Sequence, residues 1–197
     1  MAGITQAGST PDVGGAAPAV FQAALGRTYD QLPPALQNLH SVHRPRIWRG
    51  RVQVTRGPNA LAGLIASVFR FPPPSLDEDI EVTMTPTPTS EIWVRRIAGR
   101  AWRSNLRADR RVQGRIWERF GLFTFAVDLA LTDQTLQFPV TAGRFLGIPV
   151  PRQFLPISNS AERAGSDAAR ATFDVALSLP LIGDVVQYTG WLQDGET

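Results

Sequence analysis

Apolar and polar side chains alternate along several stretches of the chain, as they do in strands that bury one face. In residues 47–55, Trp48, Val52 and Val54 share one predicted face, and the opposite face is polar and rich in arginine. Residues 80–84, 136–140, 173–179 and 185–192 repeat this period of two. The chain is therefore predicted to be mostly β.

Residues 91–131 form the richest alternating stretch, with three tryptophans and nine arginines but only two acids among the arginines. When residues 117–131 are taken as one alternating run, Trp117, Arg119, Phe123 and Phe125 fall on the core face, and Glu118 falls on the opposite face. An arginine on an apolar face must meet an anion, a partner or a pocket. Arg119 is therefore a candidate anchor for an anion.

The strand before it offers a second inward arginine. Trp93 and Arg95 share one face there, and Ala98 and Gly99 are predicted to form a bulge. Arg95 and Arg119 together would form an anion-binding pair on the inner wall of a curved sheet. The alternative is a structural ion pair, or an arginine at the rim of the sheet with only its stem buried.

Helical periodicity is confined to the N-terminal third. Residues 18–25 and a stretch after Leu32, with Leu36 and Leu39 inward, predict two short helices. A third helix is predicted from Gly57-Pro58 onward, and its apolar face comprises Leu61, Leu64, Ile65, Val68 and Phe69. Its other face is small and carries no charge, so the helix either packs closely on the sheet or forms a lid over an apolar cavity.

Three segments of the chain are expected: a disordered tail at residues 1–17, one domain at 18–193 and a short tail at 194–197.

Within the domain, the acidic run at 77–81 predicts a solvated loop, and residues 162–169 predict a polar hairpin tip. The expected fold is α+β and mostly β. About seven antiparallel strands would form a strongly curved sheet or a partly closed barrel, with two or three N-terminal helices covering one face.

Composition narrows the function classes. All 20 basic residues are arginine, and the net charge is +3. There is no cysteine, which excludes disulfides and thiolate metal sites. No nucleic-acid-binding motif, secretion signal or membrane-length apolar stretch stands out, so a cytoplasmic protein without nucleic acid or membrane insertion is expected.

A series of short motifs resembles a bacterial family. The series comprises LPPAL at residues 32–36, VTRG at 54–57, FPP at 71–73, EIWVR at 91–95, WERFG at 117–121, LGIPVP at 146–151 and YTGWL at 188–192. In this order the motifs resemble domain of unknown function 4166, which occurs alone or behind a saccharopine-dehydrogenase-like domain. The resemblance implies the fold but no established reaction. No glycine-rich dinucleotide fingerprint accompanies it here.

Few residues offer reactive chemistry. His40 and His43 are the only histidines, and no third metal ligand lies near them, so neither a metal nor a cofactor is expected. His40 is a candidate acid–base group because its unperturbed pKa lies near neutrality. Glu118 and Arg119 complete the catalytic candidates. Serine-hydrolase, phosphate-loop and zinc motifs are absent.

The leading hypothesis is a module that binds a small, largely apolar organic molecule with an anionic end. The candidate ligand-binding residues are Trp48, Trp93, Arg95, Trp117, Arg119, Phe123, Phe125 and Tyr188. The rival is a cofactor-free isomerase or cyclase that uses the same cavity. A third hypothesis is an interaction domain that docks a separate dehydrogenase, and a homodimer is the other protein assembly considered. The sequence leaves open whether the protein is an enzyme.

Overall fold

The computed structural model describes residues 18–167 and 169–195. The predicted tail at residues 1–17 lies outside this part of the chain, and the last strand runs through Asp194 into the predicted C-terminal tail. The helices are α1 (Val20–Leu25), α2 (Pro34–His40) and α3 (Ala60–Val68), with 3-10 turns η1 (Gly26–Gln31) and η2 (Arg152–Phe154).

The strands fall into long and short groups. The long strands are β1 (Arg46–Arg56), β2 (Ser75–Pro86), β3 (Glu91–Ile97), β4 (Arg100–Ala108), β5 (Arg115–Phe120), β6 (Phe123–Asp128), β9 (Val140–Phe145), β13 (Ala171–Leu179) and β14 (Gly183–Asp194). The short strands are β7 (Ala130–Thr132), β8 (Thr135–Gln137), β10 (Ile148–Pro149), β11 (Ile157–Ser158) and β12 (Ala161–Ala164).

All described strands join one antiparallel sheet in the order β10-β9-β6-β5-β4-β3-β2-β1-β14-β13-β12-β8-β7, and β11 also pairs with β13. This confirms the mostly β, antiparallel prediction. The sheet has 14 strands rather than about seven, partly because β6 and β7 are interrupted at Leu129 and β8 and β9 at residues 138–139. The pairing has two free ends, β10 and β7, so the predicted barrel closure is not supported.

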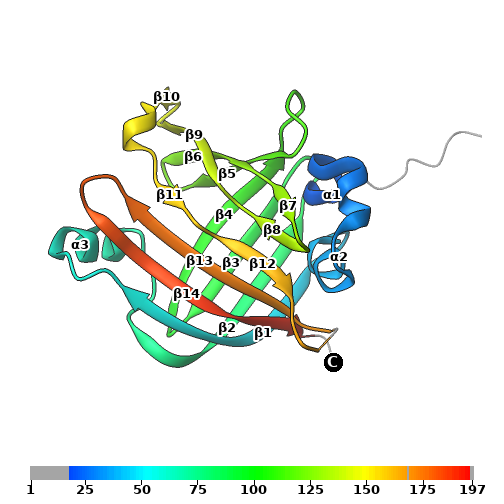
Figure 1. Ribbon diagram of the computed structural model, residues 1–197, viewed down its shortest axis with the longest axis horizontal. Coiled ribbons are helices and arrows are strands. Elements are labelled where there is room, and N and C mark those ends of the chain that lie inside the picture. Colours follow the sequence, from blue (N-terminus) through cyan, green and yellow to red (C-terminus); the bar gives the residue numbers. More distant parts are fainter. Residues whose placement is uncertain (1–17, 168, 196–197) are drawn as a thin grey trace, which may run out of the picture.

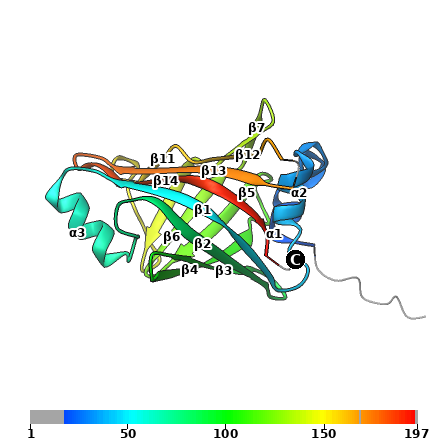
Figure 2. The ribbon, with the colours of Figure 1, turned by 90° about the horizontal axis from the view of Figure 1, so that it is seen from below.

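The sheet curves strongly around its apolar face. Figure 2 shows β13 and β14 on one side of the interior and β3 and β4 on the other. Trp48, Val52 and Val54 of β1 are buried as the alternation predicts, and the inward side chains of most strands join them in one hydrophobic core. Because antiparallel strands bury alternate residues, the outer face keeps the arginines and acids.

The helices lie at the two ends of the sheet rather than over one face, as Figure 1 shows. Helices α1 and α2 lie at one end, where α1 packs against β4 and β5 and α2 packs against β12 and β13. Helix α3 lies at the opposite end, against β14. Both ends of the interior are therefore flanked by helices, which the sequence pattern did not predict.

Helix α3 packs mainly through its small side chains rather than through the predicted apolar face, of which Ile65 also joins the contact. Ala62 and Ala66 are fully buried against Val185 of β14. Leu64 and Val68, on the face predicted to be buried, are 61% and 71% exposed. Small side chains let the helix approach the sheet closely, and this close approach turns the larger apolar side chains outward.

Two local predictions were wrong, and a third had the wrong starting residue. The acidic run is part of β2, where Asp77 and Asp79 pair with Arg51 at 2.7 and 2.6 Å. Ala98 and Gly99 form a two-residue turn with positive φ angles rather than a bulge, because Ile97 pairs directly with Arg100. The hairpin predicted at 162–169 does join β12 to β13, but its tip begins only after Ala164, which pairs with Ala171 of β13.

Candidate functional site

The curved sheet surrounds a cavity of about 480 Å³, a volume typical of sites for small organic molecules. Its walls come from β3, β4, β5, β6, β13 and β14, and most of the lining side chains are aromatic or aliphatic. The aromatic lining residues of the strands are Trp93, Trp102, Phe120, Phe123, Phe125 and Tyr188. Strands far apart in the chain therefore contribute to one apolar chamber.

The cavity is closed at the α1 end and open at the α3 end. At the closed end, the lining residues Phe21 and Trp93 are buried. At the other end, Phe69 and Phe71 line the cavity while remaining partly exposed, and Phe154 lines it while being exposed. The mouth of the cavity therefore lies beside α3 and η2.

Arg95 provides a positive charge on the apolar wall. Its Nη1 atom donates to the Ser104 hydroxyl at 2.9 Å and lies 3.7 Å from a carboxylate oxygen of Glu118. The guanidinium also lies 5.0 Å from the ring centroid of Trp93. A guanidinium carries five N–H donors, and Arg95 makes no other hydrogen bond with the described residues. Donors therefore remain available to a ligand.

Tyr188 places a hydroxyl in the same chamber. Burial raises the pKa of Tyr188 to about 12, so the hydroxyl stays protonated at neutral pH. Arg95, Glu118 and Glu162 all lie close enough to shift this pKa electrostatically. The hydroxyl forms no hydrogen bond within the described part of the chain, so it is a second donor available to a ligand.

Glu162 on the cavity wall is hydrogen-bonded to the buried His40 behind it. The carboxylate of Glu162 faces the cavity and lies 2.6 Å from His40 Nε2. The His40 ring is fully buried, and its centroid lies 3.7 Å from that of Phe21, on which it stacks. His40 is therefore held behind Glu162, and it can orient that carboxylate or exchange a proton with it.

Arg119 and Trp117 point away from the cavity, so their predicted inward placement was wrong. Phe120 pairs with Phe123 across a two-residue turn, and paired residues share a face of the sheet. The inward positions therefore change from even in β5 to odd in β6. Glu118 and Phe120 line the cavity, whereas Arg119 is exposed on the outer face.

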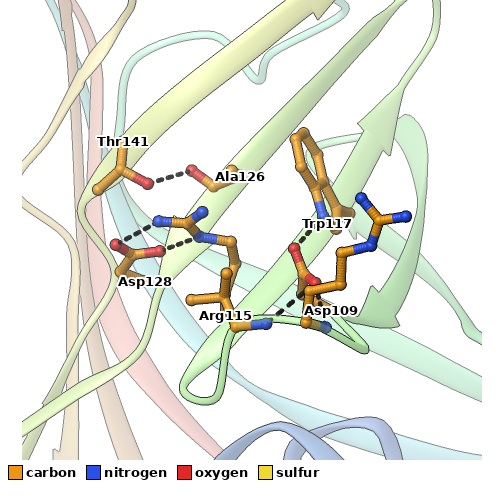
Figure 3. Close-up of polar contacts among 8 residues, drawn as sticks. Asp109, Arg115, Trp117, Ala126, Asp128 and Thr141 are labelled. Carbon is orange, nitrogen blue, oxygen red and sulfur yellow. Dashed lines mark hydrogen bonds and ion pairs between the residues drawn. The ribbon is translucent and has the colours of Figure 1, made fainter.

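Figure 3 shows what holds the outer face of β5 and β6. The Trp117 indole donates to a carboxylate oxygen of Asp109 at 2.7 Å, and Arg115 pairs with Asp128 at 2.6 Å. The Arg115 guanidinium lowers the pKa of Asp128. Backbone hydrogen bonds in the turn and the bond from Trp117 lower the pKa of Asp109. These contacts give the outer residues a structural role.

Trp48 is buried in the core beside Arg46 and does not line the cavity, unlike the prediction. The other predicted wall residues, Trp93, Arg95, Phe123, Phe125 and Tyr188, do line it. Sequence reasoning missed Glu162, which stands 122 positions from His40, so no local pattern links them. The predicted ligand-binding residues also left out Trp102, whose inward position follows from the alternation within β4.

No group of three or more histidine or acidic residues suited to a metal occurs among the described residues. None of the described helices is long and apolar enough to cross a membrane.

Comparisons with known proteins give a match to one family and a distant likeness to solved structures. The curated proteins gave no match. The crystal structure of Rv2717c from M. tuberculosis matches 84% of this chain and 99% of its own, with a TM-score of 0.46 and 12% sequence identity. The family model for a domain of unknown function, number 4166, matches residues 32–192. The chain therefore belongs to the family of domain of unknown function 4166.

Proposed function

We propose that the cavity binds a small, largely apolar organic molecule with an anionic end. The observation that carries this proposal is the Arg95 guanidinium, which stands on a largely apolar wall with N–H donors unused by the described residues. An apolar chamber with a few polar groups is the usual form of a small-molecule site. The aromatic walls would bury the apolar body of the ligand, and Arg95 would bind its charged end.

The surrounding charges define the ligand further. Glu118 already lies near Arg95, but a separation of 3.7 Å is too long for a strong charge-assisted hydrogen bond. An incoming carboxylate or sulfonate would therefore have to replace only the weak ion pair between Arg95 and Glu118. The Tyr188 hydroxyl would donate a second hydrogen bond to the same end.

A matched pair of fluorescent probes tests this proposal. Anilinonaphthalene sulfonate and phenylnaphthylamine share an apolar ring system, but only the first is anionic. We expect Arg95→Met to weaken binding of the sulfonate about tenfold or more and to leave binding of the neutral probe within about twofold. Arg119→Met, on the outer face, is the control and should change neither affinity.

A second variant locates the probe. Val175 lines the cavity, so Val175→Phe should fill part of the chamber and weaken binding of both probes. Unchanged binding of both probes to Val175→Phe would place them elsewhere. Equal losses of the two probes in Arg95→Met would remove the anionic end from the proposal.

The Glu162–His40 pair favours a second candidate, a cofactor-free isomerase or cyclase in the same cavity. A carboxylate facing the chamber, with a buried histidine behind it, is suited to removing a proton from carbon. Tyr188 and Arg95 would then stabilise the negative charge that develops on the ligand oxygen. The proton would move to Glu162 and return from there to a different carbon of the ligand.

Proton exchange into an apolar ketone tests this candidate. In D₂O, the protein should accelerate deuterium incorporation beside the carbonyl group of beta-tetralone, measured by proton NMR. Glu162→Gln should abolish the acceleration, whereas Glu81→Gln, on the outer face, should preserve it. If the rate of deuterium incorporation equals that in buffer alone while probe binding is intact, ligand binding without catalysis is favoured.

A further inference from the structure

The exposed apolar side chains gather around the mouth of the cavity. We define the mouth surface as residues 56–76, 98–100, 119–123, 144–157 and 179–184, which form α3 and the turns at its end of the sheet. Eleven of the twelve exposed large hydrophobic side chains in the described chain belong to it. Leu181 is 98% exposed and Ile148 is 68% exposed. Exposed hydrophobic side chains that cluster in this way on one protein chain mark an interaction surface.

The apolar side chains continue from one segment of this surface to the next. The ring of Phe69, just after α3, lies 5.7 Å from that of Phe123, which lies 4.8 Å from Phe145. The backbone N–H of Leu146 donates to the carbonyl of Leu122. Helix α3 is thereby connected through the β5–β6 turn to the β9–β10 turn, so the exposed leucines belong to one surface rather than to scattered loops.

The charge of the mouth surface is almost all positive. It contains six arginines and one acid, Asp184. Arg70, Arg119, Arg144 and Arg152 are exposed and form no ion pair with any described residue. Burial and the nearby Arg100 lower the pKa of Arg56, as expected where two arginines approach without an acid between them.

The nearest acids do not cancel this charge. On the adjoining part of β2, Asp77 and Asp79 are held by Arg51, which leaves Glu78 as the remaining acid there. Helix α3 by itself combines exposed apolar side chains with nearby positive charge. It buries its alanines and exposes Leu64 and Val68, and Arg56 and Arg70 flank it in the sequence. Exposed apolar side chains close in sequence to arginines without ion pairs are suited to a lipid surface with anionic headgroups.

We propose that the mouth surface docks on an anionic lipid bilayer, with the apolar side chains of α3 and the adjacent turns in the headgroup region and the arginines against lipid phosphates. In this docking, only the side chains of the mouth surface enter the headgroup region. In this orientation the cavity opens toward the bilayer. Docking itself stands without the proposed function, and only exchange of the cavity's ligand with the bilayer rests on that function.

Vesicle flotation tests the docking. The full chain should float with vesicles of phosphatidylcholine and phosphatidylglycerol, float much less with phosphatidylcholine alone, and be released by salt. Arg70→Gln with Arg152→Gln should weaken binding roughly thirtyfold, at about fivefold per charge. Leu64→Ser with Val68→Ser should weaken it by at least about tenfold.

Matched changes at the other end of the sheet provide the control. Val112 is the one exposed large hydrophobic residue outside the mouth surface in the described chain, and Arg111 is exposed beside it. Val112→Ser with Arg111→Gln should leave vesicle binding within about twofold. Equal losses in the two sets of variants would overturn docking through the mouth surface, as would the absence of flotation with anionic vesicles.

The chain contains no cysteine, so one introduced cysteine reports one position. A polarity-sensitive dye on Leu64→Cys or Leu181→Cys should brighten on anionic vesicles and be quenched by spin-labelled lipids, whereas the same dye on Val112→Cys should not. Size-exclusion chromatography with light scattering distinguishes a second copy of the chain: a dimer that is lost in Leu64→Ser with Val68→Ser would overturn the proposal in favour of self-association.

Probe binding in solution separates this proposal from the proposed function. Wild-type flotation combined with no binding of anilinonaphthalene sulfonate would support docking and contradict the ligand site. Probe binding that depends on Arg95, combined with no flotation, would support the ligand site and overturn docking.

Discussion

At the scale of single residues, the most unusual group is the buried carboxylate of Glu91. It is 1% exposed and accepts hydrogen bonds from the Val20 backbone N–H at 2.7 Å and the Trp93 indole at 2.9 Å. Burial raises the pKa of Glu91, although these hydrogen bonds and the nearby His40 and His43 lower it in part. The folded protein therefore binds this proton more tightly than the unfolded chain does.

The sign of the resulting pH dependence follows from linkage. For an acid with a raised folded pKa, the contribution to stability is fully present below the unfolded pKa of about 4.5, and it is lost as the pH rises through the folded pKa. Above pH about 4.5, we therefore expect the free energy of unfolding of Glu91→Gln to fall less with rising pH than that of the wild type. We also expect a fixed cost of about 1–3 kcal/mol, since an amide N–H₂ would face the Trp93 indole donor.

Urea unfolding of Glu91→Gln at a series of pH values measures both effects. Glu81→Gln is the matched control, because Glu81 forms ion pairs with Arg49 and Arg96 on the outer face and should not alter this part of the pH profile. A profile for Glu91→Gln parallel to that of the wild type above pH about 4.5 would contradict the assignment to Glu91.

Glu118 is expected to compete with the ligand for Arg95. Its carboxylate lies 3.7 Å from the guanidinium and would repel a second anion placed there. Glu118→Gln should therefore strengthen binding of anilinonaphthalene sulfonate by about threefold to tenfold, and it should leave phenylnaphthylamine unaffected. Fluorescence titration measures both. Weaker binding of the sulfonate would mean that Glu118 contacts the ligand as an acceptor instead.

At the scale of elements, the β5–β6 hairpin shows what the sequence could predict and what it could not. Alternation predicted the strands correctly, because a half-buried strand must alternate. It failed for Arg119 since the turn at Gly121 and Leu122 shifts the inward positions by one, and residues 117–131 are not one strand. A two-residue turn has to be located before the faces of its strands can be assigned.

Long-range pairs explain the rest of the site. Arg95 was placed correctly because Trp93 and Ile97 mark its face within one strand. Glu162 could not be found in this way, since its environment is set by β8, β13 and α2. Helix α3 was recognised by its period, but its buried face was not, because size complementarity with β14 outweighed hydrophobicity there.

The packing of α3 can be tested by two opposite changes in the helix. Ala66 is fully buried against β14, so Ala66→Leu should overpack the contact and cost about 1–3 kcal/mol. A Cβ added at Gly63 would meet no atom within 4 Å, so Gly63→Ala should stabilise the helix by roughly 0.5–1 kcal/mol. Urea unfolding measures both. A neutral Ala66→Leu would show that α3 is not held by its small face.

At the scale of the whole molecule, β1 and β14 approach each other very closely at Gly50, and β14 forms part of the cavity wall. Gly50 of β1 pairs with Leu192 of β14 on one side and with Ile80 of β2 on the other. A Cβ added at Gly50 would lie 1.7 Å from the backbone carbonyl oxygen of Trp191. A backbone oxygen cannot move aside as the end of a flexible side chain can, so any larger residue must push the two strands apart.

Gly50→Ala is therefore expected to disturb both stability and ligand binding. Separating β1 from β14 should cost roughly 2–4 kcal/mol, measured by urea unfolding. It should also weaken both fluorescent probes, since β14 contributes Val186 and Tyr188 to the cavity wall. Gln53→Ala, an exposed position on the same strand, should change neither quantity. Lost stability with unchanged probe binding would mean that the cavity does not depend on this close approach of β1 and β14.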